Sequence, residues 1–224
     1  MSLGHGPRMT RNGLVFCFDP KNTRCYSGEG VSCSDLIIRN AGIIENAPTH
    51  NPEGYFDFST NKYIRFPNDT SLDNQSFSIE VFIKTGALTQ NGFWFEKGTV
   101  NSQYALFQEG GAIRFRYNGS GIANAISLTT SLFLNTTDWF HIVATNTQGS
   151  QALYINSVLR GTNNLSTTVA VNNGGMSVGA YGGYSGSRGY YYSGSIGMVR
   201  VYNRAITSIE VAQNFEAMRG RYGI

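Results

Sequence analysis

The feature that most constrains the fold of this chain is a glycine-punctuated strand that runs into a sharply bounded helix near the C-terminus. The strand is expected over residues 194–202. Thr207 and Glu210 have the spacing of a capping box, in which a hydroxyl and a carboxylate bond the first amides of a helix reciprocally. Ile206 and Val211 are placed as the hydrophobic staple that accompanies such a start. A helix that begins so soon after a strand is expected to pack against a β body.

The buried face and the end of this helix are also predicted by the sequence. Val211, Phe215 and Met218 fall on one helical face, so that face is expected to pack inward. Gly220 is expected to stop the helix, because glycine most often takes the left-handed position at a helix end. We therefore expect residues 205–224 to form a short helix and tail that pack on the rest of the chain.

Alternation of apolar and polar residues predicts many short strands upstream of the helix. The clearest is residues 76–84, whose apolar face is Phe77, Ile79, Val81 and Ile83. Phe82 interrupts the polar face of this strand, so we expect that face to be partly covered. Further strands are expected over residues 13–19, 55–59, 62–66, 92–97, 103–108, 112–117, 123–128, 139–146, 151–156 and 175–180.

Two connections carry specific expectations. The strands on either side of Thr60 and Asn61 are close enough in sequence to form a hairpin. Residues 20–53 are rich in turn-forming residues and hold one short apolar patch at 36–38. This region is therefore expected to be mostly loop, with room for one strand.

Composition supports a β-rich fold. Only 14% of the residues are charged and glycine is abundant, which suits short strands joined by tight polar turns. About a dozen strands followed by one helix predict an all-β fold, a two-sheet antiparallel jelly-roll sandwich with a short C-terminal α-helix. We expect an extended arm over residues 1–12, the sandwich over 13–204, and the helix with its tail over 205–224.

Charge and hydropathy argue against two classes of partner. The net charge is +3, whereas nucleic-acid binding needs lysine and arginine clustered along one face. No stretch has the apolar length of a membrane helix, and no signal-peptide core precedes the first expected strand. We therefore expect no nucleic-acid or membrane partner, and synthesis in the cytoplasm without a signal peptide.

The three cysteines, Cys17, Cys25 and Cys33, lack the spacing of a zinc site. Cys17 lies within an apolar run and is expected to be a buried thiol. Cys25 and Cys33 leave two alternatives open, a disulfide or two free thiols. Free thiols are the favoured alternative in a reducing cytoplasm.

Catalytic motifs of glycan-cleaving enzymes are missing from the sequence. Glycoside hydrolysis uses two carboxylates, about 5 Å apart for retention and wider for inversion. Glu80 stands alone in its strand and Asp57 is isolated near a strand end, so each is expected to be solvated or to cap a turn. His141 lies in a strand after two aromatic residues and is expected to be half-buried and structural. The sequence therefore predicts that the protein is not an enzyme, and glycan cleavage is the distant alternative.

The best candidate for binding is the segment 181–192, which is rich in tyrosine, glycine and serine. Tyrosine offers a rigid amphipathic ring and small residues allow close approach, a composition typical of antibody paratopes. Sugar rings stack on such aromatics, and arginine can bond hydroxyls or a carboxylate. The candidate residues are Tyr181, Tyr184, Arg188, Tyr190 and Tyr191. The alternatives are a subunit contact or a flexible hairpin, with Tyr192 turned into the core.

Several segments, in order along the chain, resemble the concanavalin A-like, laminin-G-like jelly-roll family. They are residues 55–58, 63–64, 77–84, 139–145, 153–156 and 192–204. The resemblance is specific for fold and weak for function. Many relatives of this fold carry calcium at the rim of the sandwich, and the weak candidate ligands are Asp57, Asp69, Asp73 and Asp138. No calcium-loop motif is present, so no cofactor is expected to be required.

The two ends of the chain resemble a narrower group, the lectin-like structural proteins of tailed bacteriophages, particularly T4-like phages of cyanobacteria. The matching segments are residues 5–8, 13–19, 26–28, 34–36 and 214–224. The chain departs from that group at Cys33, where an aromatic residue is usual, and at Ser157, where a turn glycine is usual.

This resemblance implies a non-catalytic structural and interaction protein of the virion, either a capsid decoration or a tail or fibre component. Its partners would be other virion proteins and further copies of itself, as a homo-oligomer or in multiple copies. The alternative is a carbohydrate-binding module that recognises host surface glycans. His5, Arg8 and Arg11 of the arm are expected to anchor the domain to its neighbours at assembly.

Overall fold

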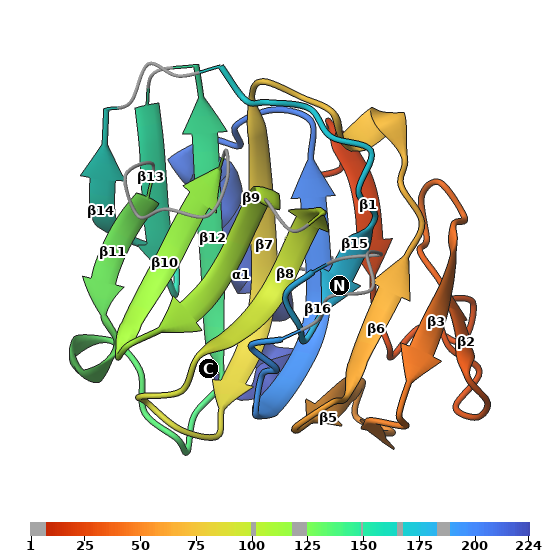
Figure 1. The fold of residues 1–224 in the computed structure, drawn as a ribbon. Coiled ribbons are helices and arrows are strands. Elements are labelled where there is room, and N and C mark those ends of the chain that lie inside the picture. Colours follow the sequence, from red (N-terminus) through yellow and green to blue (C-terminus); the bar gives the residue numbers. More distant parts are fainter. Residues whose placement is uncertain (1–7, 100–101, 118–124, 149, 165–167, 183–188) are drawn as a thin grey trace, which may run out of the picture.

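The computed structural model describes residues 8–99, 102–117, 125–148, 150–164, 168–182 and 189–224. Within these residues the chain forms two eight-stranded antiparallel sheets that pack face to face, with one helix on the outer face of one sheet (Figure 1). The predicted all-β sandwich with a C-terminal helix is confirmed. Each sheet combines strands from distant parts of the sequence, so residues far apart in the chain share each face.

The first sheet, which we call sheet A, carries the helix. Its order is β14 (Val158–Asn163), β13 (Ser150–Ile155), β12 (Phe140–Thr147), β7 (Phe77–Thr85), β16 (Gly194–Tyr202), β5 (Tyr55–Phe58) and β4 (Thr49–Asn51). The strand β1 (Leu14–Phe18) also pairs with β16. The two ends of the chain therefore meet at the centre of this sheet.

The second sheet, which we call sheet B, faces the opposite side of the molecule. Its order is β11 (Ala125–Thr129), β10 (Ala112–Tyr117), β9 (Ser102–Glu109), β8 (Gly92–Gly98), β15 (Met176–Val178), β6 (Tyr63–Phe66), β3 (Ala41–Glu45) and β2 (Ser32–Ser34). Two short 3₁₀ helices, η1 (Thr70–Leu72) and η2 (Thr130–Leu132), lie in the connections.

The core lies between the sheets and is rich in aromatic rings. Phe16 of β1 meets Phe66 of β6 edge-on at 5.1 Å, and Phe77 of β7 stacks on Tyr104 of β9 at 4.3 Å. Burying such rings is the main stabilising term, at about 25 cal/mol for each Å² of apolar surface removed from water. Because these contacts join strands of opposite sheets, they fix the sandwich as one rigid scaffold.

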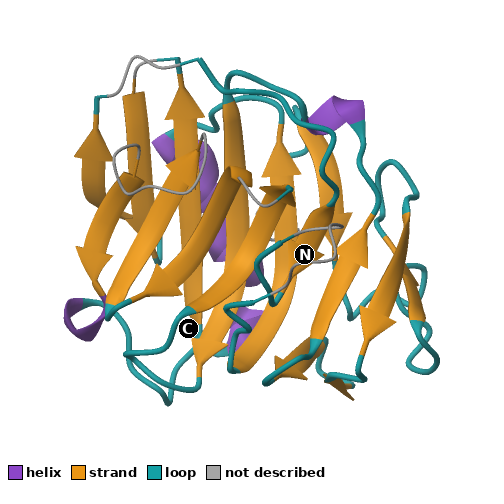
Figure 2. Cartoon of the chain, viewed as in Figure 1, coloured by secondary structure: helices purple, strands orange, loops and turns teal. Residues whose placement is uncertain are grey.

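The helix α1 (Ser208–Tyr222) packs on the outer face of sheet A (Figure 2). The capping box is present as predicted, since the Thr207 hydroxyl accepts the Glu210 N–H and the Glu210 carboxylate accepts the Thr207 N–H. The staple residues Ile206 and Val211 lie in one buried cluster. The partly covered polar face of β7 is also confirmed, because Phe82 stacks on Tyr222 at 4.4 Å.

The predicted helix end was wrong. Gly220 lies inside the helix, and Gly223, with a φ of +70°, is the C-cap. The extra turn brings Tyr222 over sheet A, where its hydroxyl accepts the Met198 N–H at 2.9 Å. The buried face also differs from the prediction, because Asn214 is buried while Phe215 is only half-buried.

The predicted hairpin around Thr60 and Asn61 was also wrong. The strand before this turn, β5, pairs with β16 and β4 in sheet A, whereas β6 pairs with β15 and β3 in sheet B. The turn therefore crosses from one sheet to the other. Both strands pack against the same core from opposite sheets. Their alternation of apolar and polar residues is therefore the same as that of two strands paired in a hairpin.

Four short strands were not located by the sequence pattern, which left room for one strand within residues 20–53. Residues 20–53 contain β2, β3 and β4, while the apolar patch at 36–38 forms no strand. The edge strand β14 follows a tight turn in which Asn156 and Ser157 have φ values of +49° and +64°. Ser157 therefore takes a left-handed conformation, which explains why glycine is usual there.

Candidate functional site

Among the described residues of the tyrosine-rich segment, Tyr181 and Tyr190 lie beside β8 on the outer side of sheet B. The Tyr181 ring lies 5.0 Å from the ring of Phe93 on β8, and the Tyr190 ring lies 6.2 Å from it. Phe93 in turn stacks on Phe107 of β9 at 4.3 Å, with the ring planes 6° apart. The rings of Phe93, Phe107 and Tyr181 belong to an apolar cluster separate from the core between the sheets.

An arginine completes this cluster. The Arg116 guanidinium of β10 lies 4.6 Å from the Phe107 ring centroid, 5.5 Å from that of Phe93 and 5.9 Å from that of Tyr181. Cations over aromatic faces are attracted by the ring quadrupole. Arg116 is buried, which lowers its pKa, and its Nε has no hydrogen-bond partner among the described residues. We call Phe93, Phe107, Arg116, Tyr181 and Tyr190 the tyrosine face.

Tyr190 is the exposed member of the tyrosine face. The residue is 51% exposed, and its carbonyl accepts the Phe93 N–H at 3.1 Å, which ties its backbone to β8. Its φ of +46° is left-handed, a costly conformation for a bulky residue. Strained residues of this kind cluster at functional sites. Tyr190 therefore presents an exposed ring from a fixed backbone.

The other candidates of this segment are placed differently. Tyr191 is half-buried, 6.1 Å from the ring of Tyr63. Tyr192 turns into the core, and its hydroxyl donates to the Lys84 carbonyl at 3.0 Å. Tyr184 and Arg188 lie outside the described residues. The structure thus brings Tyr181 and Tyr190 together and adds three residues from β8, β9 and β10 that the sequence analysis missed.

Glu80 is the centre of a buried polar network on the other side of the sandwich. Its carboxylate lies 3.1 Å from Arg200 Nη1 and 2.7 Å from His141 Nε2, and it accepts the Tyr202 hydroxyl at 3.1 Å and Asn214 Nδ2 at 3.0 Å. Burial alone would raise the pKa of Glu80, but Arg200 and His141 hold it at about 2.

The expectations of a solvated Glu80 and a half-buried His141 were therefore wrong. Both side chains are fully buried. The physical reason is that α1 and residues 8–12 cover this part of the outer face of sheet A, which the alternation pattern marks as polar. The carboxylate is enclosed by donors and serves to hold these elements together.

Residues 8–12 of the arm lie against α1 and β16. The Thr10 N–H donates to Asn214 Oδ1 at 2.7 Å, and the Tyr202 hydroxyl donates to the Thr10 carbonyl at 3.3 Å. The Arg8 and Arg11 side chains are exposed, while His5 lies outside the described residues. The part of the arm that the structure describes is therefore bound to its own domain.

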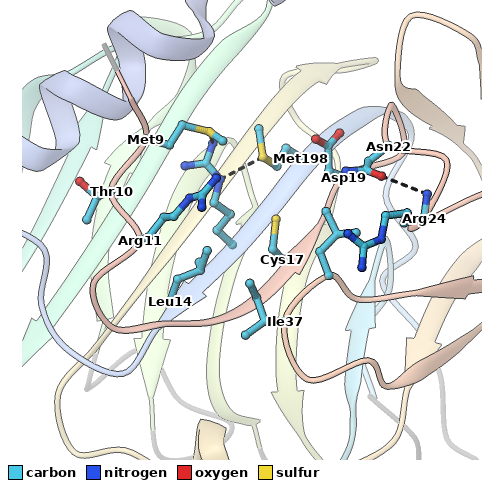
Figure 3. Close-up of a pocket in the computed structure, with 12 residues that line it drawn as sticks. Met9, Thr10, Arg11, Leu14, Cys17, Asp19, Asn22, Arg24, Ile37 and Met198 are labelled. Atoms are coloured by element: carbon cyan, nitrogen blue, oxygen red, sulfur yellow. Dashed lines mark hydrogen bonds between the residues drawn. The ribbon is translucent and has the colours of Figure 1, made fainter.

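Beside the arm, a pocket of about 390 Å³ opens on the outer side of sheet A. It is lined by Met9, Thr10, Arg11, Leu14, Cys17, Asp19, Asn22, Arg24, Leu36, Ile37, Met198 and Arg200. Figure 3 shows Met9 and Arg11 on one side and Arg24 with Asn22 on the other, with Cys17 and Met198 between them. This pocket was not predicted, because the arm, β1, β16 and two loops contribute to it.

Two comparisons with known proteins found matches. A laminin-G-type family model described as the concanavalin A-like lectin/glucanases superfamily matches residues 58–212, more than half of the chain. The chain belongs to this superfamily. No curated protein sequence matches it.

Solved structures contain similar concanavalin A-like folds. The Trypanosoma rangeli sialidase in complex with sialic acid aligns with a TM-score of 0.69 and 16% identity, over 99% of this chain and 35% of that chain. The binding domain of botulinum neurotoxin DC, in complexes with rat synaptotagmin II and with SialylT, aligns with a TM-score of 0.68 and 12% identity, over 92% of this chain and 52% of that chain. The chain thus spans about a third of the first and half of the second, and the likeness shows the fold alone.

The four aspartates considered for calcium are spread around this concanavalin A-like domain. Asp57 accepts the Ser195 hydroxyl, Asp69 caps η1, Asp73 pairs with Lys97 at 2.7 Å, and Asp138 accepts Asn135 Nδ2 at 2.7 Å. Asp69 and Asp73 flank the same short helix. Across the described part of the chain, no three His, Cys, Asp or Glu side chains form a group that could hold a metal ion.

The cysteines of the domain are all buried free thiols. Burial raises the pKa of Cys17 and of Cys33 to about 12, and it also raises the pKa of Cys25. The thiols therefore stay protonated at neutral pH, which fits the free-thiol alternative. Among the described helices, none combines the length and apolarity needed to cross a membrane.

Proposed function

We propose that this chain is a non-catalytic, lectin-like binding domain that recognises a carbohydrate through the tyrosine face. The observation that carries the proposal is Tyr190, an exposed ring on a backbone fixed to β8 and next to Tyr181 at 5.8 Å. A rigid tyrosine offers an apolar face for the C–H groups of a sugar and a hydroxyl for its polar edge.

The fold family supports this proposal. A sialidase in complex with sialic acid, which is a sugar, and a neurotoxin binding domain in complex with SialylT share this fold. A sandwich of this kind holds recognition loops on a stiff base, the usual arrangement for binding sites. The tyrosine face has this arrangement, since its rings rest on three neighbouring strands of sheet B.

The non-catalytic part of the proposal rests on the carboxylates. Glu80 is enclosed by Arg200, His141 and Tyr202, so it is inaccessible to a glycosidic bond. Asp57 accepts a hydrogen bond from Ser195 at 2.5 Å. These two were the carboxylates considered for glycan cleavage, and both have structural partners.

A glycan array tests the proposal with the purified protein and two variants. Tyr190→Ala is expected to weaken retention of the bound glycan about tenfold, because aromatic contacts of this kind contribute about 1 kcal/mol or more. Tyr154→Ala, on β13 of sheet A, is the matched control and is expected to retain binding. A chelator arm is expected to change nothing. A folded protein that binds no glycan, or equal losses in the two variants, would contradict the proposal.

We further propose that the domain works as a structural component of a phage particle. One observation favours this second role. The two segments that resemble cyanophage structural proteins, the N-terminal run and residues 214–224, come together in space, because Arg221 pairs with Asp19 at 2.8 Å and Cys17 shares a buried cluster with Met218 and Tyr222. They form one surface beside the sandwich, which suits contact with neighbouring proteins.

A further inference from the structure

The pocket on the outer side of sheet A has a cationic floor. Arg200 is buried there, and its Nη1 is taken by Glu80 at 3.1 Å. Its other donors face sulfur atoms, since Nε donates to Met198 Sδ at 2.9 Å and Nη2 contacts Met9 Sδ. Thioethers are weak acceptors, whereas carboxylates bond guanidinium strongly and in matched geometry. The floor is therefore better suited to an anionic oxygen than to the sulfurs that occupy it.

The rim of the pocket adds two further cations. Arg11 and Arg24 are exposed, and no ion pair is found for either one among the described residues. The acidic residue of the lining, Asp19, is engaged by Arg221 at 2.8 Å. Because Arg200 and Asp19 already have charged partners, Arg11 and Arg24 leave an excess of positive charge at the rim, which attracts anions.

The walls of the pocket are apolar. Leu14, Leu36 and Ile37 line it, and Ile37 is 42% exposed. Cys17 also lines it, and burial raises the pKa of its thiol to about 12, so this wall stays neutral. A ligand that filled the pocket would bury apolar surface as well as a charge.

We propose that this pocket binds a small organic carboxylate with an aliphatic chain. The positive charges of Arg11 and Arg24 at the rim attract its carboxylate, which approaches Arg200 as the Met9 side chain moves aside. Its aliphatic part packs on Leu14 and Ile37. The volume of about 390 Å³ lies within the range of small-molecule sites. The site lies on the opposite side of the sandwich from the tyrosine face and is independent of the proposed function.

Titration with hexanoate, followed by NMR of ¹³C-labelled methionine methyl groups, tests this site. The Met9 and Met198 signals are expected to shift together, while Met176, buried in the main core, serves as the internal reference. Hexanamide, which has a similar shape without the charge, is expected to bind about tenfold more weakly. Equal affinities for the two compounds, or shifts confined to other methionines, would overturn the proposal.

Rim variants connect the binding to the pocket. Arg11→Gln and Arg24→Gln are each expected to weaken hexanoate binding about tenfold without unfolding the protein, because both side chains are exposed. Arg160→Gln, an exposed arginine on the edge strand β14, is the control for general loss of charge and is expected to retain full affinity. Losses that are equal in all three variants would mean non-specific attraction and would overturn the assignment.

Discussion

Glu80 shows how one residue can join three elements of a fold. Its carboxylate meets Arg200 of β16, His141 of β12 and Asn214 of α1, and Asn214 in turn accepts the N–H of Thr10. A buried charge is costly unless donors surround it, and removing one partner leaves the others unpaired. The network therefore holds the helix and the arm against sheet A as a unit.

The network predicts a loss of stability in acid. The pKa of Glu80 is about 2 in the folded protein against 4.5 for the free side chain, so its contribution is complete above pH 4.5 and disappears as the pH falls toward 2. Such a shift corresponds to about 3 kcal/mol of unfolding free energy. Urea unfolding at pH 7, 5 and 3 measures it. Glu80→Gln is expected to lower stability at pH 7 and to flatten this pH dependence, whereas the exposed Glu216→Gln is expected to leave it unchanged. An unaltered pH profile in Glu80→Gln would contradict the assignment.

At the scale of elements, the start of α1 is fixed by hydrogen bonds between residues that are close in sequence. The Thr207 hydroxyl accepts the Glu210 N–H, and the Glu210 carboxylate pairs with Arg204 at 2.5 Å. The Arg204 hydrogen bond is the main reason why the pKa of Glu210 is lowered to about 2. The last turn is held differently, by the packing of Tyr222 on Phe82.

Removing the N-cap side chain is expected to destabilise the first turn of α1. Thr207→Ala should lower the unfolding free energy by about 1 kcal/mol, because an N-terminal amide loses its acceptor. Thr207→Ser keeps the hydroxyl and is expected to remain close to the unchanged protein. Thermal unfolding measures the stability, and hydrogen exchange of the Val211 amide reports the local opening. If the alanine and serine variants behaved alike, the hydroxyl would have no capping role.

At the scale of the whole molecule, the two outer faces differ in what they expose. Sheet B presents the tyrosine face, while sheet A carries α1 and residues 8–12, with the pocket beside Arg200 between these residues and the loop around Ile37. The scaffold between them is one aromatic core. The two proposed binding sites therefore lie on opposite sides of the molecule and do not overlap.

The proposed role of the arm in a phage particle can be tested by shortening it. Deleting residues 1–7 keeps the contacts of Thr10 with Asn214 and Tyr202, so the melting temperature is expected to stay unchanged. If the arm anchors the domain to neighbouring virion proteins, the truncated protein should no longer co-sediment with particles. Incorporation at the normal level would contradict a role of the arm in assembly.

The sequence by itself determined the features that depend on near neighbours. The capping box of α1, the strand predicted over residues 76–84 and the sandwich class follow from spacings of a few residues. All three are present, and the strand is β7, Phe77–Thr85. Tyr181 and Tyr190 could likewise be selected as binding candidates, because the composition of their segment is local. These patterns can be recognised in the sequence because they depend on residues that are close together in it. The hydrogen bonds at a helix N-terminus involve one turn, and side-chain alternation in a strand involves adjacent residues.

The tertiary structure alone decided which surfaces meet. Alternation shows that Glu80 lies on the second face of β7, but only the packing of α1 and the arm makes that face buried. In the same way, Phe107 and Arg116 join the tyrosine face because β9 pairs with β8 and β10 pairs with β9. The physical reason is that burial and charge pairing depend on contacts between residues far apart in the chain, which a local pattern does not contain.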